Sequence, residues 1–210
     1  VSGLIFDVYQ YLRGTENFFV DLCLEKAFAH ALIETIAELM TTLYVNMVTP
    51  LAPYLTWVEF ATDYGTQNGP FISPELYREF FKGPESRIFA EVKNATPDAK
   101  IFMHSCGSVK RLIPDLIDAG VEILSALQPL AFEMDATALK REFGNDLVFH
   151  GGIDMQQALV GTREQTVAET ERCLAAFAPG GGYIGAPSNH FTSDVPVENF
   201  FALYETLRGE

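Results

Sequence analysis

Positive charge is scarce in this sequence: 14 lysines and arginines stand against 28 aspartates and glutamates, a formal net charge of -14. A field of this sign repels a polyphosphate backbone, so we expect no nucleic-acid partner. Long apolar runs are lacking as well. The run Ala27 to Met40 is interrupted by His30, Glu34 and Glu38, and no stretch reaches the roughly 20 apolar residues that span a bilayer. We therefore expect a soluble protein without a membrane partner.

Cysteine is also rare, with Cys23, Cys106 and Cys173 at unrelated spacings, and no charged and then apolar leader opens the chain. This pattern favours a reducing cytoplasm. The chain begins at Val1 rather than at a methionine, in a segment that we expect to be structured. We therefore expect a fragment of a longer protein.

What the sequence has in quantity is apolar and aromatic residues, 48% and 12%, enough for one large core. No composition change marks a boundary, so residues 1–210 are predicted to form one domain. Short β-branched or aromatic runs alternate with longer amphipathic ones, which predicts strands alternating with helices. The predicted strands are Tyr54 to Phe60, Ala99 to His104, Val121 to Ala126, Leu147 to His150 and Gly182 to Ala186, with Val1 to Phe6 as the possible end of another.

The segments between these strands carry the signals of helix ends. Ser73 and Pro74 predict a helix start, with the helix running to about Lys93, and Gly120 predicts a helix end. Another helix should follow Gly161 and end near Pro179, and the last should open at Asp194 to Glu198. Crossover helices between strands imply a parallel sheet, closed as a barrel or open and doubly wound.

The G-x-G-x-x-G dinucleotide fingerprint after a first strand is missing, which favours the barrel over the doubly wound sheet. A complete barrel needs eight strands and about 250 residues. We therefore predict an α/β fold, a partial (β/α) TIM-type barrel whose N-terminal strands are missing.

In such a barrel the active site gathers at the carboxyl ends of the strands, and polar residues follow each predicted strand here. Asp63 and His150 are candidate catalytic residues. The candidate substrate-binding residues are Gln67, Gln128, Asp154, Ser188 and Asn189. Helix capping is the alternative for a single residue of this kind, and it is an even choice for Asp154 and Ser108.

The segment His104-Ser105-Cys106-Gly107 is the most informative of these strand ends. Side chains two residues apart on a strand point to the same side, so His104 and Cys106 could bind one zinc ion. A catalytic zinc site takes three protein ligands, and His190 is the candidate for the third. Cys23 and Cys173 lie in predicted helices, where we expect them to pack as small apolar residues.

Several motifs, in order and spacing, resemble the uroporphyrinogen decarboxylase superfamily over nearly the whole chain. They are Leu12-Arg13-Gly14 with Asp21, Asp63-Tyr64-Gly65-Thr66-Gln67, Ile72-Ser73-Pro74-Glu75, His104-Ser105-Cys106-Gly107, Phe149-His150-Gly151-Gly152-Ile153-Asp154, and Ala186-Pro187-Ser188 before Asp194-Val195-Pro196. The resemblance is closer to the zinc- and corrinoid-dependent methyltransferase branch than to the porphyrin enzyme.

For the methyltransferase branch, the resemblance implies that His104 and Cys106 bind zinc, which activates a thiol to take a methyl group from methylcobalamin. Relatives move methyl groups from methylamines, methanol or methoxylated aromatics. A corrinoid, supplied by a partner protein, and a small-molecule substrate are therefore implied. The position that usually carries the third ligand is Asn189 here, with His190 next to it.

Two alternatives stay open. In the decarboxylase branch, Tyr11 would correspond to the tyrosine near the reacting porphyrin, which makes Tyr11 a third candidate catalytic residue. The other alternative is a noncatalytic remnant or a corrinoid-protein binding partner. Because unpaired sheet edges invite partners, we also expect a possible homo-oligomer formed at the edge left by the missing strands.

Overall fold

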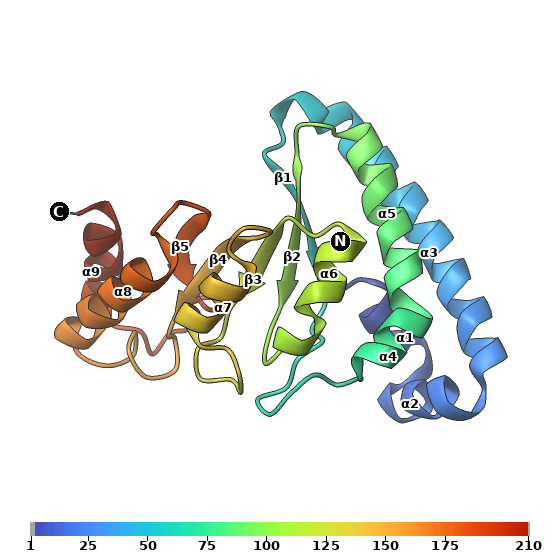
Figure 1. Cartoon of the computed structure of the whole chain (residues 1–210), viewed down its shortest axis with the longest axis horizontal. Coiled ribbons are helices and arrows are strands. Elements are labelled where there is room, and N and C mark those ends of the chain that lie inside the picture. The colour runs from blue at the N-terminus through green and yellow to red at the C-terminus, as the bar shows by residue number, and fades with distance from the viewer. Residues whose placement is uncertain (1–2, 210) are drawn as a thin grey trace. The chain divides into compact units, whose positions relative to one another are not determined.

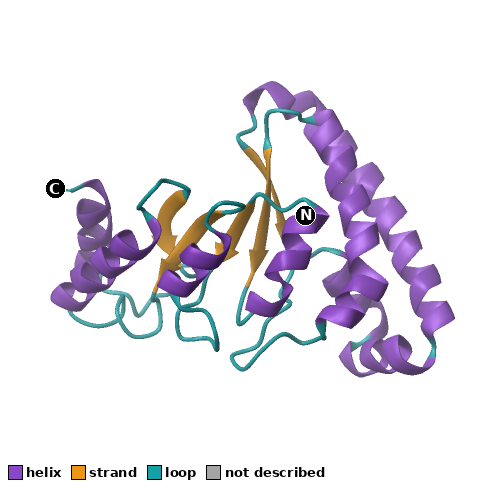
Figure 2. Ribbon diagram, in the orientation of Figure 1, coloured by secondary structure: helices purple, strands orange, loops and turns teal. Residues whose placement is uncertain are grey.

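The computed structural model describes residues 3–209 and contains a five-stranded sheet, shown by the orange arrows of Figure 2. The strands are β1 (Trp57–Ala61), β2 (Lys100–Ser105), β3 (Ile123–Ala126), β4 (Val148–Ile153) and β5 (Tyr183–Pro187). All five predicted strands are confirmed to within a few residues. The largest differences are three residues: β1 begins at Trp57 rather than at Tyr54, and β4 continues to Ile153 beyond the predicted end at His150.

The strand order β1-β2-β3-β4-β5 follows the chain, and β1 pairs with β2, β3 with β4, and β4 with β5 in parallel. A doubly wound sheet reverses its strand order at a switch point, and this order has no reversal. The sheet is therefore of the (β/α) barrel type, with five of the eight strands that a closed barrel requires.

The contacts of the chain divide it into two compact units, which we describe separately. Unit 1 comprises the described residues up to Tyr64, with Pro70–His104 and Arg111–Glu122. It contains β1, β2 and the helices α1 (Ile5–Arg13), α2 (Thr15–Leu24), α3 (Lys26–Val48), η1 (Thr49–Tyr54), α4 (Pro74–Leu76), η2 (Tyr77–Phe81), α5 (Lys82–Ala95) and α6 (Ile113–Ala119). The long helices α3 and α5 lie side by side (Figure 1).

Aromatic side chains form much of the core of unit 1. The ring of Phe6 lies 5.0 Å from Phe18, 4.7 Å from Tyr64 and 5.7 Å from Phe81, measured between ring centroids. All four side chains are buried. Phe6 anchors α1 in this cluster, so the prediction that Val1 to Phe6 ends a strand is wrong for Ile5 and Phe6, which begin a helix. Val1 and Ser2 lie outside the described residues.

The motif Leu12-Arg13-Gly14 with Asp21 joins α1 to α2. Arg13 donates two hydrogen bonds to the Asp21 carboxylate, at 2.8 and 3.1 Å, and the Tyr9 hydroxyl donates a third at 3.1 Å. The arginine holds the pKa of the buried Asp21 below its usual range. These residues therefore stabilise the packing of the first two helices.

The predicted helix starts and ends are largely confirmed. Ser73 caps the first turn through a 3.3 Å bond from the Leu76 amide, and Gly120 ends α6 with a φ of 113°. The helix expected from Pro74 to Lys93 is interrupted by η2, a π-helical turn. Turns of this kind occur frequently at functional sites.

Unit 2 comprises Gly65–Gly69, Ser105–Lys110 and the described residues from Ile123 onward. Strands β3, β4 and β5 are accompanied by α7 (Ala136–Phe143), α8 (Arg163–Phe177) and α9 (Val197–Arg208), and α8 and α9 lie side by side (Figure 1). The short helix η3 (Lys110–Leu112) crosses the boundary between the units. A cluster of buried residues forms one core of unit 2: Ile153, Met155, Leu159, Cys173 and Leu203.

Within residues 3–209, one helical segment, Lys26–Tyr54, is long and apolar enough by length and composition to cross a membrane. It comprises α3 and η1, and α3 packs against α1, α2 and α5 inside unit 1. About 33% of the tested window is buried in the structure, and a single helix of this kind is weak evidence for a membrane span.

Candidate metal-binding active site

The loop after β1 carries Asp63 and is fixed at both ends. Ala61 is opposite His104 in the β1–β2 register, and the Thr62 amide donates a 2.9 Å bond to the His104 carbonyl. This pairing brings the end of β1 level with the end of β2. On the other side of Asp63, the buried Tyr64 donates a 2.6 Å hydrogen bond to Glu85.

Glu85 is completely buried and also accepts a 2.9 Å hydrogen bond from Tyr77. Burial raises the pKa of its carboxyl to about 8, although the two tyrosine hydroxyls oppose the rise. Burial likewise raises the pKa of Tyr64 and Tyr77 well above the usual range. At neutral pH these three groups form an uncharged, hydrogen-bonded anchor below the Asp63 loop.

The segment His104-Ser105-Cys106-Gly107 ends β2, and two glycines fix its turn. Gly107 has a φ of 77°, and a Cβ there would lie 2.6 Å from the Gly65 carbonyl oxygen. A Cβ on Gly65 would lie 2.7 Å from the Ser108 amide nitrogen. The Ser108 amide also donates a 2.7 Å bond to the Thr66 carbonyl. Only glycine permits so close an approach of the two loops.

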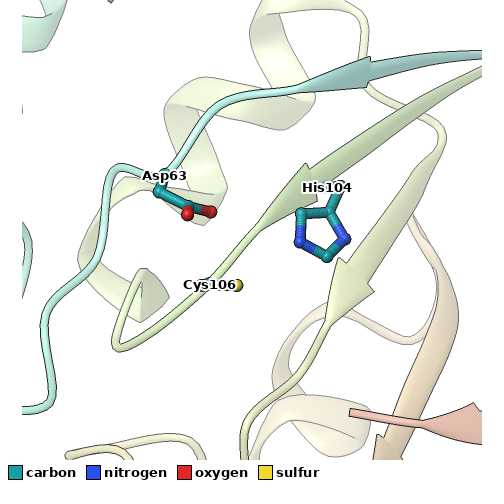
Figure 3. Close-up of side chains that lie close together, drawn as sticks. All are labelled: Asp63, His104 and Cys106. Atoms are coloured by element: carbon teal, nitrogen blue, oxygen red, sulfur yellow. The ribbon is translucent and has the colours of Figure 1, made fainter. Parts of the chain in front are cut away.

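The side chains of Asp63, His104 and Cys106 surround one small region at the ends of β1 and β2 (Figure 3). Their possible ligand atoms, a carboxylate oxygen, a ring nitrogen and the thiol sulfur, all lie within 4.8 Å of one another. The ligand atoms of a tetrahedral zinc site are about 3.3 to 3.8 Å apart. Small side-chain rotations would therefore bring these three atoms around one ion. Oxygen, nitrogen and sulfur together suit zinc, so the residues fit the metal.

Two carboxamides contact the Cys106 turn within unit 2. The Gln128 Oε1 accepts a 2.9 Å bond from the Gly107 amide, and the Gln67 Nε2 lies 3.5 Å from the same oxygen. The Asn189 Nδ2 lies 3.7 Å from the Cys106 sulfur. Two of the predicted substrate-binding residues, Gln128 and Asn189, thus contact the turn that carries the predicted metal ligand Cys106, and Gln67 contacts Gln128.

A cavity of about 470 Å³ opens beside this cluster within unit 2. Asp154, Ser188 and His190 line it together with Gln128 and Asn189. The buried Asp154 carboxylate accepts bonds from the amides of residues 156, 157 and 158, at 2.8, 3.1 and 3.2 Å. Asp154 therefore caps the turn after β4, as its capping interpretation predicted, and also lies in the cavity wall.

His190, the predicted third metal ligand, lines the cavity and is not part of the cluster found among the described residues. His150 and Tyr11 lie in neither the cluster nor the cavity wall. His150 lies within β4, and its Nδ1 is 3.0 Å from the Ser125 hydroxyl of β3. Tyr11 lies on α1, and 75% of its surface is exposed. Their catalytic roles stay predictions.

The other two cysteines differ from each other. Cys173 is buried, donates to the Gly152 carbonyl at 3.1 Å, and has its thiol pKa raised by burial to about 12. The expectation that it packs in the core is confirmed. Cys23 is exposed on α2, so the same expectation was wrong for it, because the sequence does not show which side of that helix faces water.

Two carboxyl groups near the cluster were not predicted from sequence. One is Glu85, described above. The other is Asp7 of α1, whose pKa is raised by burial and, to a smaller extent, by the charge of Asp63. Asp7 follows the segment that we expected to end a strand, and Glu85 stands in the polar run Lys82-Gly83-Pro84-Glu85 that gives no sign of burial. Buried tyrosines at Tyr64 and Tyr77 were the available signal, because a buried hydroxyl needs a partner.

Comparison with known proteins places this chain in a family. Residues 2–209 match the uroporphyrinogen decarboxylase (URO-D) family. The chain belongs to the URO-D family. One similar protein is methylcobamide:CoM methyltransferase MtaA of Methanosarcina barkeri, 28% identical over 133 residues. That alignment covers 63% of this chain and 36% of the relative.

A solved structure, a methyltransferase from Methanosarcina mazei, superposes on 99% of this URO-D chain with a TM-score of 0.77 at 20% identity. This likeness confirms the predicted fold. The chain covers 57% of that structure, so it corresponds to part of the barrel of these relatives.

Proposed function

We propose that this chain carries the metal site of a zinc-dependent methyltransferase, which moves a methyl group between a corrinoid and a thiol or a methoxylated or methylated small molecule. The observation that carries the proposal is the cluster of Asp63, His104 and Cys106 within 4.8 Å. Two similar proteins named as methyltransferases support the same reaction class. The corrinoid would arrive on a partner protein, and we expect the reaction in the cytoplasm.

In this proposal Asp63, His104 and Cys106 hold the zinc, and His190 remains the alternative to Asp63 that the sequence suggested. When bound, zinc would lower the pKa of a substrate thiol and keep it as a thiolate at neutral pH. Asn189 would orient the Cys106 sulfur, and Gln128 would fix the turn through the Gly107 amide. The cavity beside them would receive the substrate.

Methyl transfer from a methylcorrinoid to a thiol requires no oxidant, reductant or other reactant. When bound by its partner protein, a methylcorrinoid would supply the methyl group and keep the electron pair of its carbon–cobalt bond. The substrate thiolate would form the S–CH₃ bond, and the thiol proton would pass to solvent. The chain's residues contribute positioning and an electrostatic environment.

The two alternatives make different demands on this site. Porphyrin decarboxylation does not require a thiolate and an imidazole at the end of one strand. A noncatalytic remnant does not require the two carboxamides that contact the Cys106 turn. Both alternatives predict an intact protein without bound zinc and without methyl transfer.

The test uses the intact protein purified with zinc. We expect about one zinc per chain by mass-spectrometric metal analysis and formation of a methyl thioether from methylcobalamin and 2-mercaptoethanol. Cys106→Ser should lose both zinc and transfer, whereas Cys23→Ser, a matched change at an exposed cysteine, should retain both. Wild-type protein with far less than one zinc, or with zinc but without transfer, would contradict the proposal.

A further inference from the structure

The cavity beside the metal cluster is formed by segments that follow three strands of unit 2. Gln128 follows β3, Asp154 and Met155 follow β4, and Asn189 follows β5. Its volume of about 470 Å³ is in the range of small-molecule sites. Because Asn189 contacts the Cys106 sulfur, a substrate in this cavity would have its reactive end near the metal and its other end against the remaining wall.

That remaining wall is acidic or neutral. The charged side chains among the described residues that line it are Asp154 and Asp194, and no lysine or arginine is among them. Among the described lining residues, His190 is the one able to carry a positive charge. The neutral polar groups are carboxamides and hydroxyls, and Met155 and Val160 add apolar surface.

The two carboxylates differ in how they are satisfied. Asp154 is buried and accepts three backbone amide hydrogens, so its charge is already stabilised by the turn after β4. Asp194 is exposed and accepts a hydrogen bond from the Thr192 hydroxyl, which leaves other lone pairs of its carboxylate for a ligand. Asp194 is therefore the group in this wall best suited to contact a positive ligand end.

The chemistry of such a wall selects by charge. An anionic group would give up hydration without an arginine or lysine to replace it and would face two carboxylates. A hydroxyl can exchange hydrogen bonds with the polar lining residues Gln156 and Thr192, and an ammonium group can also donate to Asp194.

We propose that the small molecule bound here carries a neutral or cationic group, not an anionic one, at the end away from the metal. This inference rests on the proposed thiol and methyl chemistry and specifies its substrate class. Asp194 is its specificity-determining residue.

The test compares three thiols that share a two-carbon spacer: 2-mercaptoethanol, cysteamine and 2-mercaptoethanesulfonate. Each is titrated into the intact, zinc-loaded protein at pH 8 by isothermal calorimetry, where imidazoles carry little positive charge. We expect the neutral and cationic thiols to bind about tenfold more tightly than the sulfonate, the scale of a like-charge penalty near a protein surface.

Two variants distinguish the effect of the charge in the cavity wall on affinity from the effect of the different thiol pKa values. Asp194→Asn should weaken cysteamine about threefold or more, as loss of an exposed ion pair does, and leave 2-mercaptoethanol unchanged. Asp146→Asn removes the same charge from an exposed position before β4, at the opposite strand end, and should change neither.

Equal affinities for the three thiols, or tightest binding of the sulfonate, would overturn this inference and leave the proposed function intact. Failure of all three to bind zinc-loaded protein would overturn both.

Discussion

The Tyr64 hydroxyl donates a 2.6 Å hydrogen bond to the buried Glu85 carboxyl, and Tyr64 is the residue directly after Asp63. Tyr77 donates to the other oxygen of the same carboxyl at 2.9 Å. The loop that carries a candidate metal ligand is therefore anchored on a protonated carboxyl in the core of unit 1.

This anchor predicts a pH dependence of stability. The folded-state pKa of Glu85 is about 8, above the ordinary value of 4.5, so the unfolded chain releases this proton first as pH rises. The contribution of Glu85 to stability is fully present below pH 4.5 and is lost as pH rises to about 8, by an amount on the order of 5 kcal/mol. Urea unfolding from pH 5 to pH 9 measures it.

Glu85→Gln is the matched variant for that measurement. Glutamine keeps an oxygen acceptor for one tyrosine and cannot ionise, so the fall in unfolding free energy between pH 5 and pH 8 should be much smaller. The same pH profile in wild type and Glu85→Gln would show that Glu85 does not titrate in this range.

The contact between Gly107 and Gly65 predicts a second effect. Gly107→Ala combines a positive φ with a Cβ at 2.6 Å from the Gly65 carbonyl oxygen, so the Cys106 turn must move. We expect a loss of about 3 kcal/mol or more in unfolding free energy and weaker zinc binding.

Gly180→Ala is its control, because Gly180 has a similar φ of 79° and nothing within 4 Å of an added Cβ. It should cost about 1 kcal/mol from backbone strain alone and leave zinc binding unchanged. Equal effects of the two substitutions on zinc affinity would show that the contact between Gly107 and Gly65 does not support the metal site.

The cluster predicts that Asp63 is the third zinc ligand. Asp63→Asn should weaken zinc binding at least tenfold, because an amide oxygen is a poorer ligand than a carboxylate. His190→Ala should leave the affinity unchanged, because the His190 ring is not part of the cluster found among the described residues. Competition with a chromophoric chelator measures both, and the reverse result would make His190 the ligand.

The sheet edges predict self-association. In the described part of the chain, β1 and β5 are the outer strands, and an unpaired edge offers backbone groups to another strand. The 210-residue chain purified by itself should form a concentration-dependent dimer in sedimentation velocity. A monomer at every concentration up to about 100 μM, well within the range where exposed edges associate, would contradict this.

Several of these features could be read from the sequence because they depend on neighbours in the chain. The five strands follow from alternating periods and glycine or proline punctuation. The pairing of His104 with Cys106 follows from their i, i+2 spacing. The position of Asp63 beside them could not be read in this way, because it depends on the register that sets Ala61 opposite His104.

The remaining differences concern orientation. The sequence offered Asn189 and His190 as neighbours, and the chain directs the Asn189 amide toward the Cys106 sulfur. From the sequence, Cys23 and Cys173 were both predicted to pack inside helices, yet only Cys173 is buried. Side-chain direction and helix face are set by tertiary packing, which a single sequence does not specify.

Zinc-edge X-ray absorption of the intact protein, before and after addition of 2-mercaptoethanol, tests the central claim most directly. We predict one sulfur from Cys106 with nitrogen and oxygen ligands in the resting protein, and a second sulfur after the thiol is added. No sulfur in the resting spectrum, or a sulfur count that the thiol leaves unchanged, would contradict a site built from Asp63, His104 and Cys106 to activate a thiol.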